Sequence, residues 1–310
     1  MTVTTIWADA HIFVYHRFGD SRHPSTNTSI EELRKEFDYF KQNGYEVVPL
    51  SKLVETIKKK ESVPDNWVVL TIDDNYKSFY QNGLSVFKEY GYPFSLFVYV
   101  GAVDKKYSDF TTWEELKEIG KYGSLEFHSY GHEHMTQISD EQIRQDFEKG
   151  LSLFEKNLGI KPKYFSYPYG EFNERAKEIS KNYGFEAIIN QNTGAIAHFS
   201  DPYDLDRCAL VGETNLQKYL KYKALDAQWI EPKEYPKDDI LLHVKVKFNN
   251  PTKHGGVYLS GHGYRDVAVI NNELNVKMDK KLTQERSRIM VSSGNKISTK
   301  LLIKDTYGTH

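Results

Sequence analysis

The stretch Trp67-Val-Val-Leu-Thr-Ile-Asp73-Asp74 joins a run of apolar residues to two adjacent carboxylates. An apolar run without polar alternation is typical of a strand that is buried on both faces of a parallel sheet. Adjacent carboxylates repel each other, and ionising both beside an apolar core is costly unless a cation is present. For an isolated Asp-Asp pair, a solvated turn or a helix N-cap is the simpler explanation. The stretch therefore predicts a buried strand with a polar end, whose role depends on its neighbours.

Short apolar runs alternate with amphipathic helical patterns over residues 11–225. Between residues 30 and 43, for example, Leu33, Phe37 and Phe40 recur at spacings of three and four, as on one face of a helix. Several predicted helices open with capping-box pairs, namely Ser29 with Glu32, Thr112 with Glu115, and Ser139 with Gln142. The predicted strands lie at 11–16, 45–50, 67–73, 94–100, 124–128, 164–167, 186–190 and 205–211. Repeated strand–helix units predict an α/β fold with a parallel sheet, open or closed into a barrel.

The pattern changes after Leu225. Residues 226–238 contain Pro232 and Pro236 among charged residues, which predicts a linker. From residue 239 to 310, short stretches of strict apolar–polar alternation are separated by Asn- and Gly-rich turn signals. This part is predicted to be a small antiparallel β domain, similar to a sandwich.

Composition limits the classes of partner. Lys and Arg total 41, Asp and Glu total 43, and the net charge of −2 offers no basic excess for a nucleic acid or an anionic membrane. No apolar run is long enough to span a membrane, and no feature predicts an obligate protein partner. Cys208 is the single cysteine, which excludes an intramolecular disulfide and a cysteine-rich zinc site. A soluble globular protein is predicted.

The N-terminus gives one indication of location. Ala8-Asp-Ala10 fits the small-x-small pattern that precedes a signal-peptidase cut, although residues 1–10 lack a basic start and are too short for a complete signal. Residues 1–10 are therefore read either as the remnant of an export signal or as a frayed terminus. The first reading predicts an exported protein.

Two further polar clusters follow predicted strands. In His128-Ser-Tyr-Gly-His132, two imidazoles four residues apart share one face of a helical turn, and imidazole is a preferred ligand of zinc and related metals. His134 is expected to be a bystander. Tyr164-Phe-Ser-Tyr-Pro-Tyr-Gly170 predicts a rigid turn whose backbone N–H can point into a cleft. Surface histidines and a packing turn are the structural alternatives for these two clusters.

The three clusters gain specificity from their order. Parallel α/β folds place their active sites at the C-terminal ends of the strands, which is where all three clusters are predicted to lie. One carboxylate and two histidines can form a facial metal site with open positions for water and substrate. A second carboxylate beside the metal can act as a general base.

Thr-Ile-Asp-Asp, His-Ser-x-x-His and Tyr-Pro-Tyr-Gly, in this order, closely resemble the motifs of the polysaccharide deacetylase family (NodB homology domain, carbohydrate esterase family 4). The resemblance covers about residues 10–225. It is nearest to the branch that acts on poly-N-acetylglucosamine and related exopolysaccharides, through residues 14–17, 37–50 and 112–116. It implies a distorted (β/α) barrel and hydrolytic N-deacetylation of an acetylated glucosamine-type polysaccharide, with release of acetate.

The resemblance also implies roles for individual residues. Asp73 matches the catalytic base, and Asp74, His128 and His132 match the ligands of one divalent metal ion, for which zinc is expected. The backbone N–H of Tyr169 matches the donor that stabilises the oxyanion. Sugar rings are expected to contact the site residues Tyr15, His16, Trp113, Tyr130 and Tyr167.

Three positions depart from the family pattern. Asn75 replaces the usual glycine, a tolerable change because Asn also accepts left-handed backbone geometry. Ser166 replaces the arginine that orients the base. The family's general acid is a histidine on a late strand, and either His243 or His16 is a candidate for it, so the acid stays unassigned.

Two other functions stay open. One is a carbohydrate-binding protein that has lost catalysis, suggested by the missing arginine and the unassigned acid. The other is a metal-dependent hydrolase of a different C–N bond, such as a cyclic amide or imide. In the β domain, Tyr258, His262, Tyr264 and Arg265 are either a glycan-contacting edge or part of an ordinary packing strand.

Overall fold

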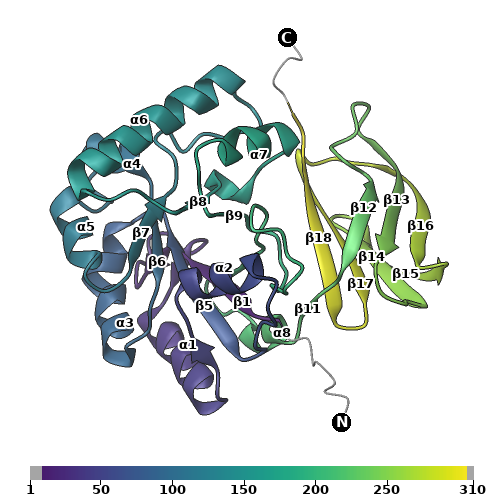
Figure 1. Ribbon diagram of the computed structural model, residues 1–310, viewed down its shortest axis with the longest axis horizontal. Coiled ribbons are helices and arrows are strands. Elements are labelled where there is room, and N and C mark those ends of the chain that lie inside the picture. Colours follow the sequence, from purple (N-terminus) through teal and green to yellow (C-terminus); the bar gives the residue numbers. More distant parts are fainter. Residues whose placement is uncertain (1–8, 306–310) are drawn as a thin grey trace.

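The computed structural model describes residues 9–305 (Figure 1). Residues 1–8, which make up most of the predicted signal remnant, lie outside the described residues. Asp9 and Ala10, which were assigned to the same terminal segment, are instead built into the fold. Ala10 exchanges two backbone hydrogen bonds with Ile196, and Asp9 accepts a hydrogen bond from the N–H of Ala224. Backbone pairing of this kind holds these two residues in place.

The first part of the molecule is a curled parallel sheet in the strand order β10-β1-β5-β6-β7-β8-β9, with β4 beside β5. All of its strand pairs are parallel, as the alternating strand–helix pattern predicts. The strands are β1 (His11–Tyr15), β4 (Glu46–Val47), β5 (Trp67–Asp73), β6 (Ser95–Val98), β7 (Ser124–Phe127), β8 (Tyr164–Ser166), β9 (Ala187–Ile189) and β10 (Cys208–Ala209).

Residues 205–210 connect the two edges of this sheet. Leu205 N–H donates to Ile188 O, and Asn190 N–H donates to Leu205 O, so the segment extends the sheet beyond β9. Three residues later, β10 pairs with β1. The sheet is therefore a distorted barrel, and the segment that precedes β10 completes it.

Helices surround the barrel (Figure 1). Thr112 and Ser139 cap their helices with complete capping boxes, and Ser29 caps α1 by accepting from Glu32 N–H. The helices are α1 (Ile30–Gln42), α2 (Leu50–Lys58), α3 (Leu84–Tyr90), α4 (Val100–Asp104), α5 (Trp113–Ile119), α6 (Asp140–Leu158), α7 (Glu174–Lys181) and α8 (Leu216–Leu220). Shorter elements are β2 (Arg17–Phe18), β3 (Asn27–Thr28), a π-helical turn at Phe79–Gly83 and a 3-10 turn at Pro168–Gly170. None of the helices within residues 9–305 has the length and apolar character needed to cross a membrane.

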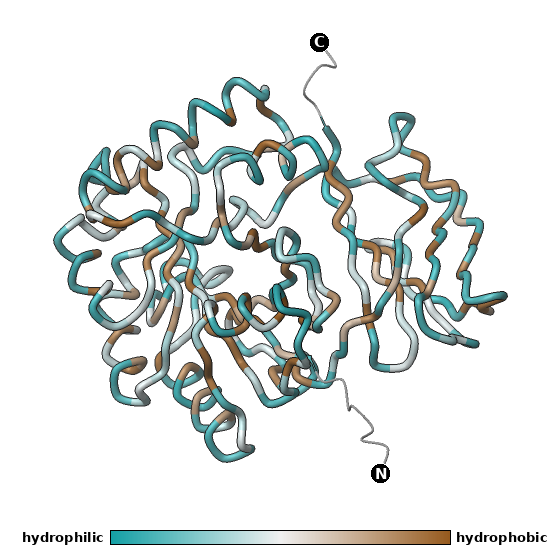
Figure 2. The backbone as a smooth tube through the Cα atoms, viewed as in Figure 1, coloured by the Kyte–Doolittle hydropathy of each residue, from teal (hydrophilic) through white to brown (hydrophobic). Residues whose placement is uncertain are grey.

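Two apolar clusters hold the barrel together. The larger one fills the layer between the sheet and the outer helices and is rich in aromatic rings, with Phe13, Phe37 and Phe127 among its fully buried members. The smaller one lies on the inner face of the sheet, where Val69 and Phe97 share a cluster with Leu53 of α2. Figure 2 shows the hydrophobic residues concentrated along the inner strands and on the inward sides of the helices. Alternate residues of β5 belong to the two clusters, which explains why residues 67–70 are all apolar.

The second part is an eight-stranded sheet in the order β11-β18-β17-β14-β15-β16-β13-β12. Residues from both halves of the sheet, such as Val257 and Val244, share one core, so the sheet folds over itself as a sandwich. All of its neighbours pair antiparallel except β11 with β18. The strands are β11 (Lys223–Ala224), β12 (Ala227–Glu231), β13 (Ile240–Phe248), β14 (His254–Leu259), β15 (Gly263–Ile270), β16 (Glu273–Lys281), β17 (Arg286–Ser293) and β18 (Lys296–Ile303).

The structure corrects the predicted linker at residues 226–238. Ala227–Glu231 forms β12, which pairs antiparallel with β13, and β11 pairs with β18 before it. The proline signal was misleading because Pro232 follows the last residue of the strand and does not interrupt it. The sandwich therefore begins before the predicted linker.

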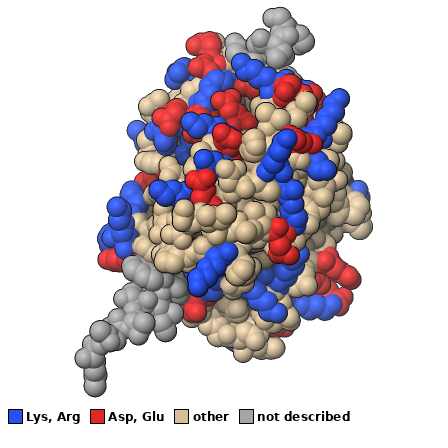
Figure 3. Space-filling model, turned by 90° about the vertical axis from the view of Figure 1, so that its right-hand side faces the viewer, with Lys and Arg blue, Asp and Glu red and all other residues tan. Residues whose placement is uncertain are grey.

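The sandwich contacts the barrel directly. Thr299 Oγ1 on β18 donates to Thr193 O in the loop after β9, at 2.6 Å. Arg286 on β17 forms an ion pair with Glu171, at 3.2 Å between Nη1 and Oε1. Figure 3 views the sandwich side of the molecule, where Lys and Arg are interspersed with uncharged surface and acidic side chains gather towards the C-terminal end. The contacts fix the sandwich beside the loops that follow β8 and β9.

Candidate active site

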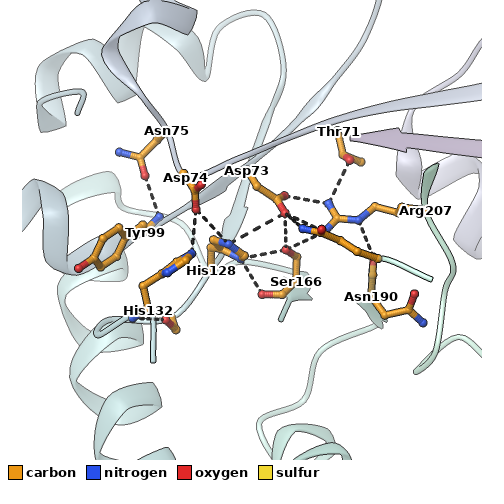
Figure 4. Close-up of polar contacts among 12 residues, drawn as sticks. Thr71, Asp73, Asp74, Asn75, Tyr99, His128, His132, Ser166, Asn190 and Arg207 are labelled. Atoms are coloured by element: carbon orange, nitrogen blue, oxygen red, sulfur yellow. Dashed lines mark hydrogen bonds and ion pairs between the residues drawn. The ribbon is translucent and has the colours of Figure 1, made fainter. Parts of the chain in front are cut away.

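The polar clusters predicted from the sequence meet at the C-terminal edge of the parallel sheet. Asp73 ends β5 and Asp74 follows it, His128 follows β7, and Ser166 ends β8. The side chains of these residues point toward one another (Figure 4). The chain brings them together because β5, β7 and β8 run parallel, so their carboxyl ends share one edge.

Asp74, His128 and His132 form a compact group of metal-ligand type. Asp74 Oδ1 lies 3.2 Å from His128 Nε2 and 2.9 Å from His132 Nε2. This oxygen is buried, yet it has no hydrogen-bond partner of good geometry among the described residues. Burial raises the pKa of Asp74, but the two imidazoles outweigh it and hold the pKa well below its usual value. A charged oxygen between two imidazole nitrogens, without a satisfied hydrogen bond, fits a shared divalent cation.

The backbone around this group is strained. Asp74, Asn75, Ser129, His132 and Tyr169 all have positive φ angles, between 46° and 71°, although none of them is a glycine. Such conformations are uncommon for residues with a Cβ and concentrate at functional sites. The prediction that Asn75 can replace a glycine in left-handed geometry is confirmed by its φ of 46°. Strain at five positions directs the side chains of the motif loops into one place.

Ser166 orients the imidazole of His128 through Nδ1, the ring nitrogen that is remote from Asp74. This nitrogen lies 2.7 Å from the backbone oxygen of Ser166 and 2.9 Å from the Ser166 hydroxyl. Donation of the Nδ1 proton to the carbonyl oxygen leaves Nε2 with its lone pair directed at Asp74. Fixing the tautomer of a ligand histidine in this way is the usual function of such a contact.

Asp73 is fully buried and is held by Arg207, which the sequence analysis did not identify. Arg207 Nη1 donates to Asp73 Oδ1 at 2.8 Å, and Nη2 donates to Oδ2 at 2.7 Å, a bidentate ion pair (Figure 4). Burial raises the pKa of Asp73, but Arg207 and His128 outweigh it and lower the pKa below its usual value. Asp73 is therefore ionised and fixed in orientation.

Arg207 replaces the arginine that was missing from the third motif. Its Nε donates to Asn190 O at 2.8 Å, and its guanidinium also reaches Thr71 Oγ1 and Ser166 Oγ. The residue lies directly before β10, in the segment that completes the barrel, and its side chain is fully buried. An arginine inside the apolar strand pattern of residues 205–211 was the signal that could have revealed it, because a buried guanidinium requires a carboxylate partner.

The two candidates for the general acid differ in position. His16 follows β1, and burial lowers the pKa of its imidazole, against the opposing effect of the nearby Asp74 and Asp73 carboxylates. His16 Nδ1 is buried and has no hydrogen-bond partner within residues 9–305. His243 lies on β13 opposite Lys277. In Figure 1, β18 lies between β13 and the barrel. The structure thus brings His16 into the site and leaves His243 outside it.

Tyr169 lies beside the metal-ligand group. Its ring is 4.7 Å from that of His132 and is stacked on His134, with 4.0 Å between the ring centroids. His134 Nδ1 is 2.6 Å from Glu171 Oε2, and Glu171 in turn pairs with Arg286. As expected, His134 is outside the ligand group, but it supports the Tyr169 ring and so connects the site to the sandwich.

The expectation that Tyr15 and Tyr167 contact sugar is wrong. Both side chains are fully buried, and the Tyr15 hydroxyl donates to Glu36 Oε2 at 2.7 Å, behind the sheet. Tyr167 stacks on Phe172 in the outer cluster. Tyr15 precedes His16 and Tyr167 follows Ser166, and successive side chains of an extended chain point to opposite faces, so the rings lie away from the face that carries His16 and Ser166.

Trp113 and Tyr130 were also expected to contact sugar. Trp113 is the first residue of α5 and packs against the outer aromatic cluster. The Tyr130 hydroxyl donates to Asp104 at 2.9 Å, and Lys149 lies 3.9 Å above its ring. The structure therefore gives both residues packing contacts on the helical layer and does not bring them to Asp73.

Tyr99 is an aromatic neighbour of the site that sequence reasoning did not select. Its ring is half-buried, 5.1 Å from that of His132, and its N–H donates to Asn75 Oδ1 at 2.7 Å. Burial raises the pKa of Tyr99 to about 12, so the hydroxyl is neutral at physiological pH. Its place at the C-terminal end of the predicted strand 94–100 was the available signal. The rings of Tyr99 and Tyr169 both contact that of His132.

A second acid–histidine group, Asp20, His23 and Asp109, has a different character. Asp20 accepts hydrogen bonds from Arg17 and Arg22, and both arginines also pair with Asp109. The two guanidinium groups already neutralise both carboxylates. We regard this group as an ion-pair cluster that fixes the loop between β2 and β3.

Comparisons with known proteins agree with the geometry. Residues 60–188 match the family model described as polysaccharide deacetylase. Poly-beta-1,6-N-acetyl-D-glucosamine N-deacetylase of Escherichia coli K12 is 24% identical over 245 residues, which cover 64% of this chain and 36% of the relative. The protein of the same name from Staphylococcus aureus MSSA476 is 23% identical over 208 residues, covering 63% of this chain and 71% of the relative. The chain thus spans about a third of the E. coli relative and most of the S. aureus one.

A solved structure shows the same fold. The Streptococcus pyogenes deacetylase PplD, determined in complex with acetate, superposes with a TM-score of 0.61 at 18% identity and covers 66% of this chain and 93% of its own. The family match spans the strand ends that carry Asp73, Asp74, His128 and Tyr169. The barrel topology and the order of the motifs agree with this match. The barrel therefore contains a segment, residues 60–188, that matches the polysaccharide deacetylase family, and the barrel as a whole has the fold of a solved deacetylase.

Proposed function

We propose that the protein is a metal-dependent hydrolase that removes acetyl groups from an N-acetylglucosamine-containing polysaccharide. The observation that carries the proposal is the juxtaposition of an ionised, clamped Asp73 with the Asp74–His128–His132 group. The printed activities of the E. coli and S. aureus relatives support the choice of substrate class. The acetate in the S. pyogenes structure supports the choice of product.

Asp74, His128 and His132 would hold one divalent ion, for which we propose zinc. A facial set of one carboxylate and two imidazoles leaves coordination positions open, and borderline metals such as zinc favour these donors. When bound, the ion polarises the acetamide carbonyl and lowers the pKa of water. The unsatisfied Asp74 Oδ1 and the oriented His128 Nε2 support this assignment.

Asp73 acts as the general base. It is ionised, and Arg207 keeps one orientation of the carboxylate, so it accepts the proton that leaves the attacking water as the new C–O bond forms. The N–H of Tyr169 donates to the developing oxyanion, an interaction often worth about 3 kcal/mol. The left-handed geometry of Tyr169 supports this assignment, because strained backbone at an active site is often part of the mechanism.

His16 supplies the second proton. The C–N bond breaks with its electron pair on nitrogen, and His16 protonates that nitrogen, so that acetate and a free amine leave. Proximity to Asp73 and Asp74 supports His16 over His243. The flanking rings of Tyr99 and Tyr169 offer apolar faces to the sugar that carries the acetamide.

The presence of Arg207 weakens the binding-only alternative. That alternative was based in part on the missing arginine at position 166, and Arg207, directly before β10, clamps Asp73 from another part of the chain. A protein that only binds glycan has no need for an ionised carboxylate held beside metal-type ligands.

We also propose that the enzyme acts outside the cytoplasm, where exopolysaccharide and cell-wall glycan are found. The substrate class proposed above supports this location, and Asp9 and Ala10, which are hydrogen-bonded into the fold, do not. Cell fractionation with an antibody against the protein tests this proposal, and accumulation in the cytosolic fraction alone would contradict it.

Acetate release from an N-acetylglucosamine oligomer tests the activity. Removing metal with a chelator should abolish release, and adding back zinc should restore it. Asp73→Asn should keep stoichiometric zinc, measured by elemental analysis, and lose about 10²–10⁴ in kcat. Asp266→Asn, an exposed acid on β15, is the matched control and should keep full activity. Unchanged turnover in Asp73→Asn would remove Asp73 from the mechanism, and release that persists without metal would overturn the metal assignment.

A further inference from the structure

A cleft of about 780 Å³ lies between the barrel and the sandwich, separate from the metal-ligand group. Its barrel side is formed by the start of α7 and the loop after β9, and its sandwich side by β12 and β18. Figure 1 shows β18 and β12 on the side of the sandwich that faces α7. The mechanism proposed above uses none of the residues that line this cleft.

Aromatic rings line both walls of the cleft. Trp229 and Tyr235 come from the sandwich side, and Phe172 and Phe199 come from the barrel side. Phe199 is 39% exposed, and the indole N–H of Trp229 is fixed by Ser298 Oγ at 2.9 Å. Flat apolar faces with a few fixed polar groups are typical of sites that bind small molecules or sugars.

The polar lining of the cleft is predominantly acidic. Among the described residues, seven carboxylates and three cationic side chains line it. Lys177, below the lining, pairs with Asp201 and Asp204, but Asp206 has no ion pair within residues 9–305. Asp206 accepts a hydrogen bond from Asn190 Nδ2, and burial together with the nearby Asp204 raises its pKa. Asp206 thus lines the cleft without a cationic partner among the described residues.

Asn192 gives an independent indication of a ligand. Its side chain is only 5% exposed and lines the cleft, and its Oδ1 has no hydrogen-bond partner among the described residues. An unsatisfied buried acceptor of this kind costs about 1–3 kcal/mol. Asn192 Oδ1 requires a hydrogen-bond donor, and Asp206, which already accepts from Asn190, lacks an ion pair among the described residues. A ligand with several N–H donors and a positive charge satisfies both, and an ammonium group has these properties.

The cleft also shares its inner wall with the active site. Asn192 follows Gln191, whose side-chain Nε2 lies 3.5 Å from Asp73 Oδ2. Asp206 precedes Arg207, the clamp on Asp73. Phe172 follows Glu171, which holds the His134 ring against Tyr169. Adjacent residues of three loops therefore face the catalytic groups on one side and the cleft on the other.

We propose that this cleft binds a glucosamine-containing segment of the polymer whose amino groups have already been freed. The inference rests on the proposed deacetylase function, because that reaction converts a neutral acetamide into an ammonium group. The aromatic rings stack on the sugars, and Asp206 and Asn192 accept hydrogen bonds from an ammonium. Retention of the deacetylated segment beside the active site keeps the remaining acetylated units near Asp73.

Binding of defined oligomers tests the proposal. We choose the full chain carrying Asp73→Asn, so that nothing is hydrolysed, and titrate it calorimetrically with a glucosamine hexamer and with its fully N-acetylated counterpart. The deacetylated hexamer should bind, and adding Trp229→Ala or Asp206→Asn should weaken its binding about tenfold, as expected for one lost charge-assisted or stacking contact. Binding of the acetylated hexamer should change less than twofold in either variant.

Matched controls lie outside the cleft. Tyr122→Ala and Asp266→Asn remove an exposed ring that follows α5 and an exposed acid of β15, and both should leave binding of the deacetylated hexamer unchanged. Asp226→Asn is the second acidic variant of the cleft, for use if Asp206→Asn fails to fold in a thermal melt. Equal binding by the parent and the cleft variants, or equal weakening for both hexamers, would overturn the proposal. If the proposed deacetylase function itself were wrong, the result would be different, because the unmutated zinc-loaded enzyme would release no acetate.

Discussion

The barrel and the sandwich use polar groups in opposite ways. The barrel buries Asp73, Arg207, Glu36 and Glu126, whereas residues 239–305 bury only Ser287 and Thr299 among their described polar side chains. Buried charges are expensive unless they are paired, and the buried ion pair of Asp73 with Arg207 lies at the strand ends where the proposed chemistry occurs. No charged side chain among the described residues of 239–305 is fully buried, although residues 239–310 contain 12 Lys and Arg against 6 Asp and Glu. Buried charge, more than overall charge, marks the functional region.

The largest loss of activity and stability is expected from removing the guanidinium of Arg207, which forms the buried ion pair with Asp73. Arg207→Met should lower kcat about 10²-fold or more and destabilise the fold by about 3–5 kcal/mol, because it leaves Asp73 as an unpaired buried charge. Since Arg207 lowers the pKa of Asp73, its loss raises that pKa, and the acid limb of the kcat/KM profile should move to higher pH. Arg207→Lys keeps a charge and should shift the limb less. A pH profile that is identical in the unmutated enzyme and Arg207→Met would show that the clamp does not set the charge of Asp73.

A buried carboxyl on α1 should make stability depend on pH. Burial raises the pKa of Glu36 from 4.5 to about 8, despite the hydrogen bond from Tyr15. The folded chain therefore holds the proton more tightly than the unfolded chain. The contribution is complete below pH 4.5, falls as the pH rises towards about 8, and is constant above that. Urea unfolding of Glu36→Gln should show a smaller downward slope than the unmutated protein, because only buried carboxyls such as Glu126 then contribute, whereas Glu31→Gln, a surface variant of the same helix, should retain the full slope. A slope that is identical in Glu36→Gln and the unmutated protein would assign it to other groups.

Replacing one glycine in the barrel and one in the sandwich tests whether the barrel is packed more rigidly. A Cβ added at Gly150 on α6 would lie 2.7 Å from the ring of Phe127, which is fully buried and has no room to move. Gly150→Ala should destabilise the protein by about 1–2 kcal/mol in spite of the better helix propensity of alanine. In the sandwich, a Cβ at Gly256 would meet the ring of Tyr264, which is 58% exposed and can swing away. Gly256→Ala should change the free energy of unfolding by less than about 1 kcal/mol, and equal losses at both positions would contradict the difference in rigidity.

The smallest effect is expected from an ion pair of the sandwich. Lys245 Nζ and Glu273 Oε1 are 3.2 Å apart across β13 and β16, and each side chain is 32% exposed. Lys245→Ala should cost no more than about 1 kcal/mol, and 0.5 M salt should remove most of that cost. A loss as large as that in Arg207→Met would show that burial is not what separates the two ion pairs.

Much of the barrel was predictable because local patterns determine its elements. The continuous apolar run of β5 and the capping pairs at Thr112 and Ser139 required no tertiary information. The motif spacing likewise indicated Asp74, His128 and His132, which the fold brings together. Tyr15 and Tyr167 were misassigned because both faces of an inner strand are buried, so an aromatic residue beside a motif points as easily into the helical layer as into the site.

Arg207 could not be placed from its sequence position alone. Its partner Asp73 is 134 residues away, and the pairing depends on how the last strand closes the barrel. The strand β12 was missed for a related reason, because five residues beside two prolines form a strand only when β13 is present as a partner. In both cases the deciding interaction is long-range, which local patterns do not report.

The late position of Arg207 has a consequence for how the enzyme matures during synthesis. The strands that carry Asp73 and the two histidines emerge from the ribosome first, and the guanidinium follows only with the segment that joins the sheet edges. A nascent or truncated chain that stops after β9 already contains every proposed metal ligand but not the partner that sets its base. On the proposed mechanism such a fragment captures metal yet hydrolyses nothing, so catalytic competence coincides with completion of the barrel.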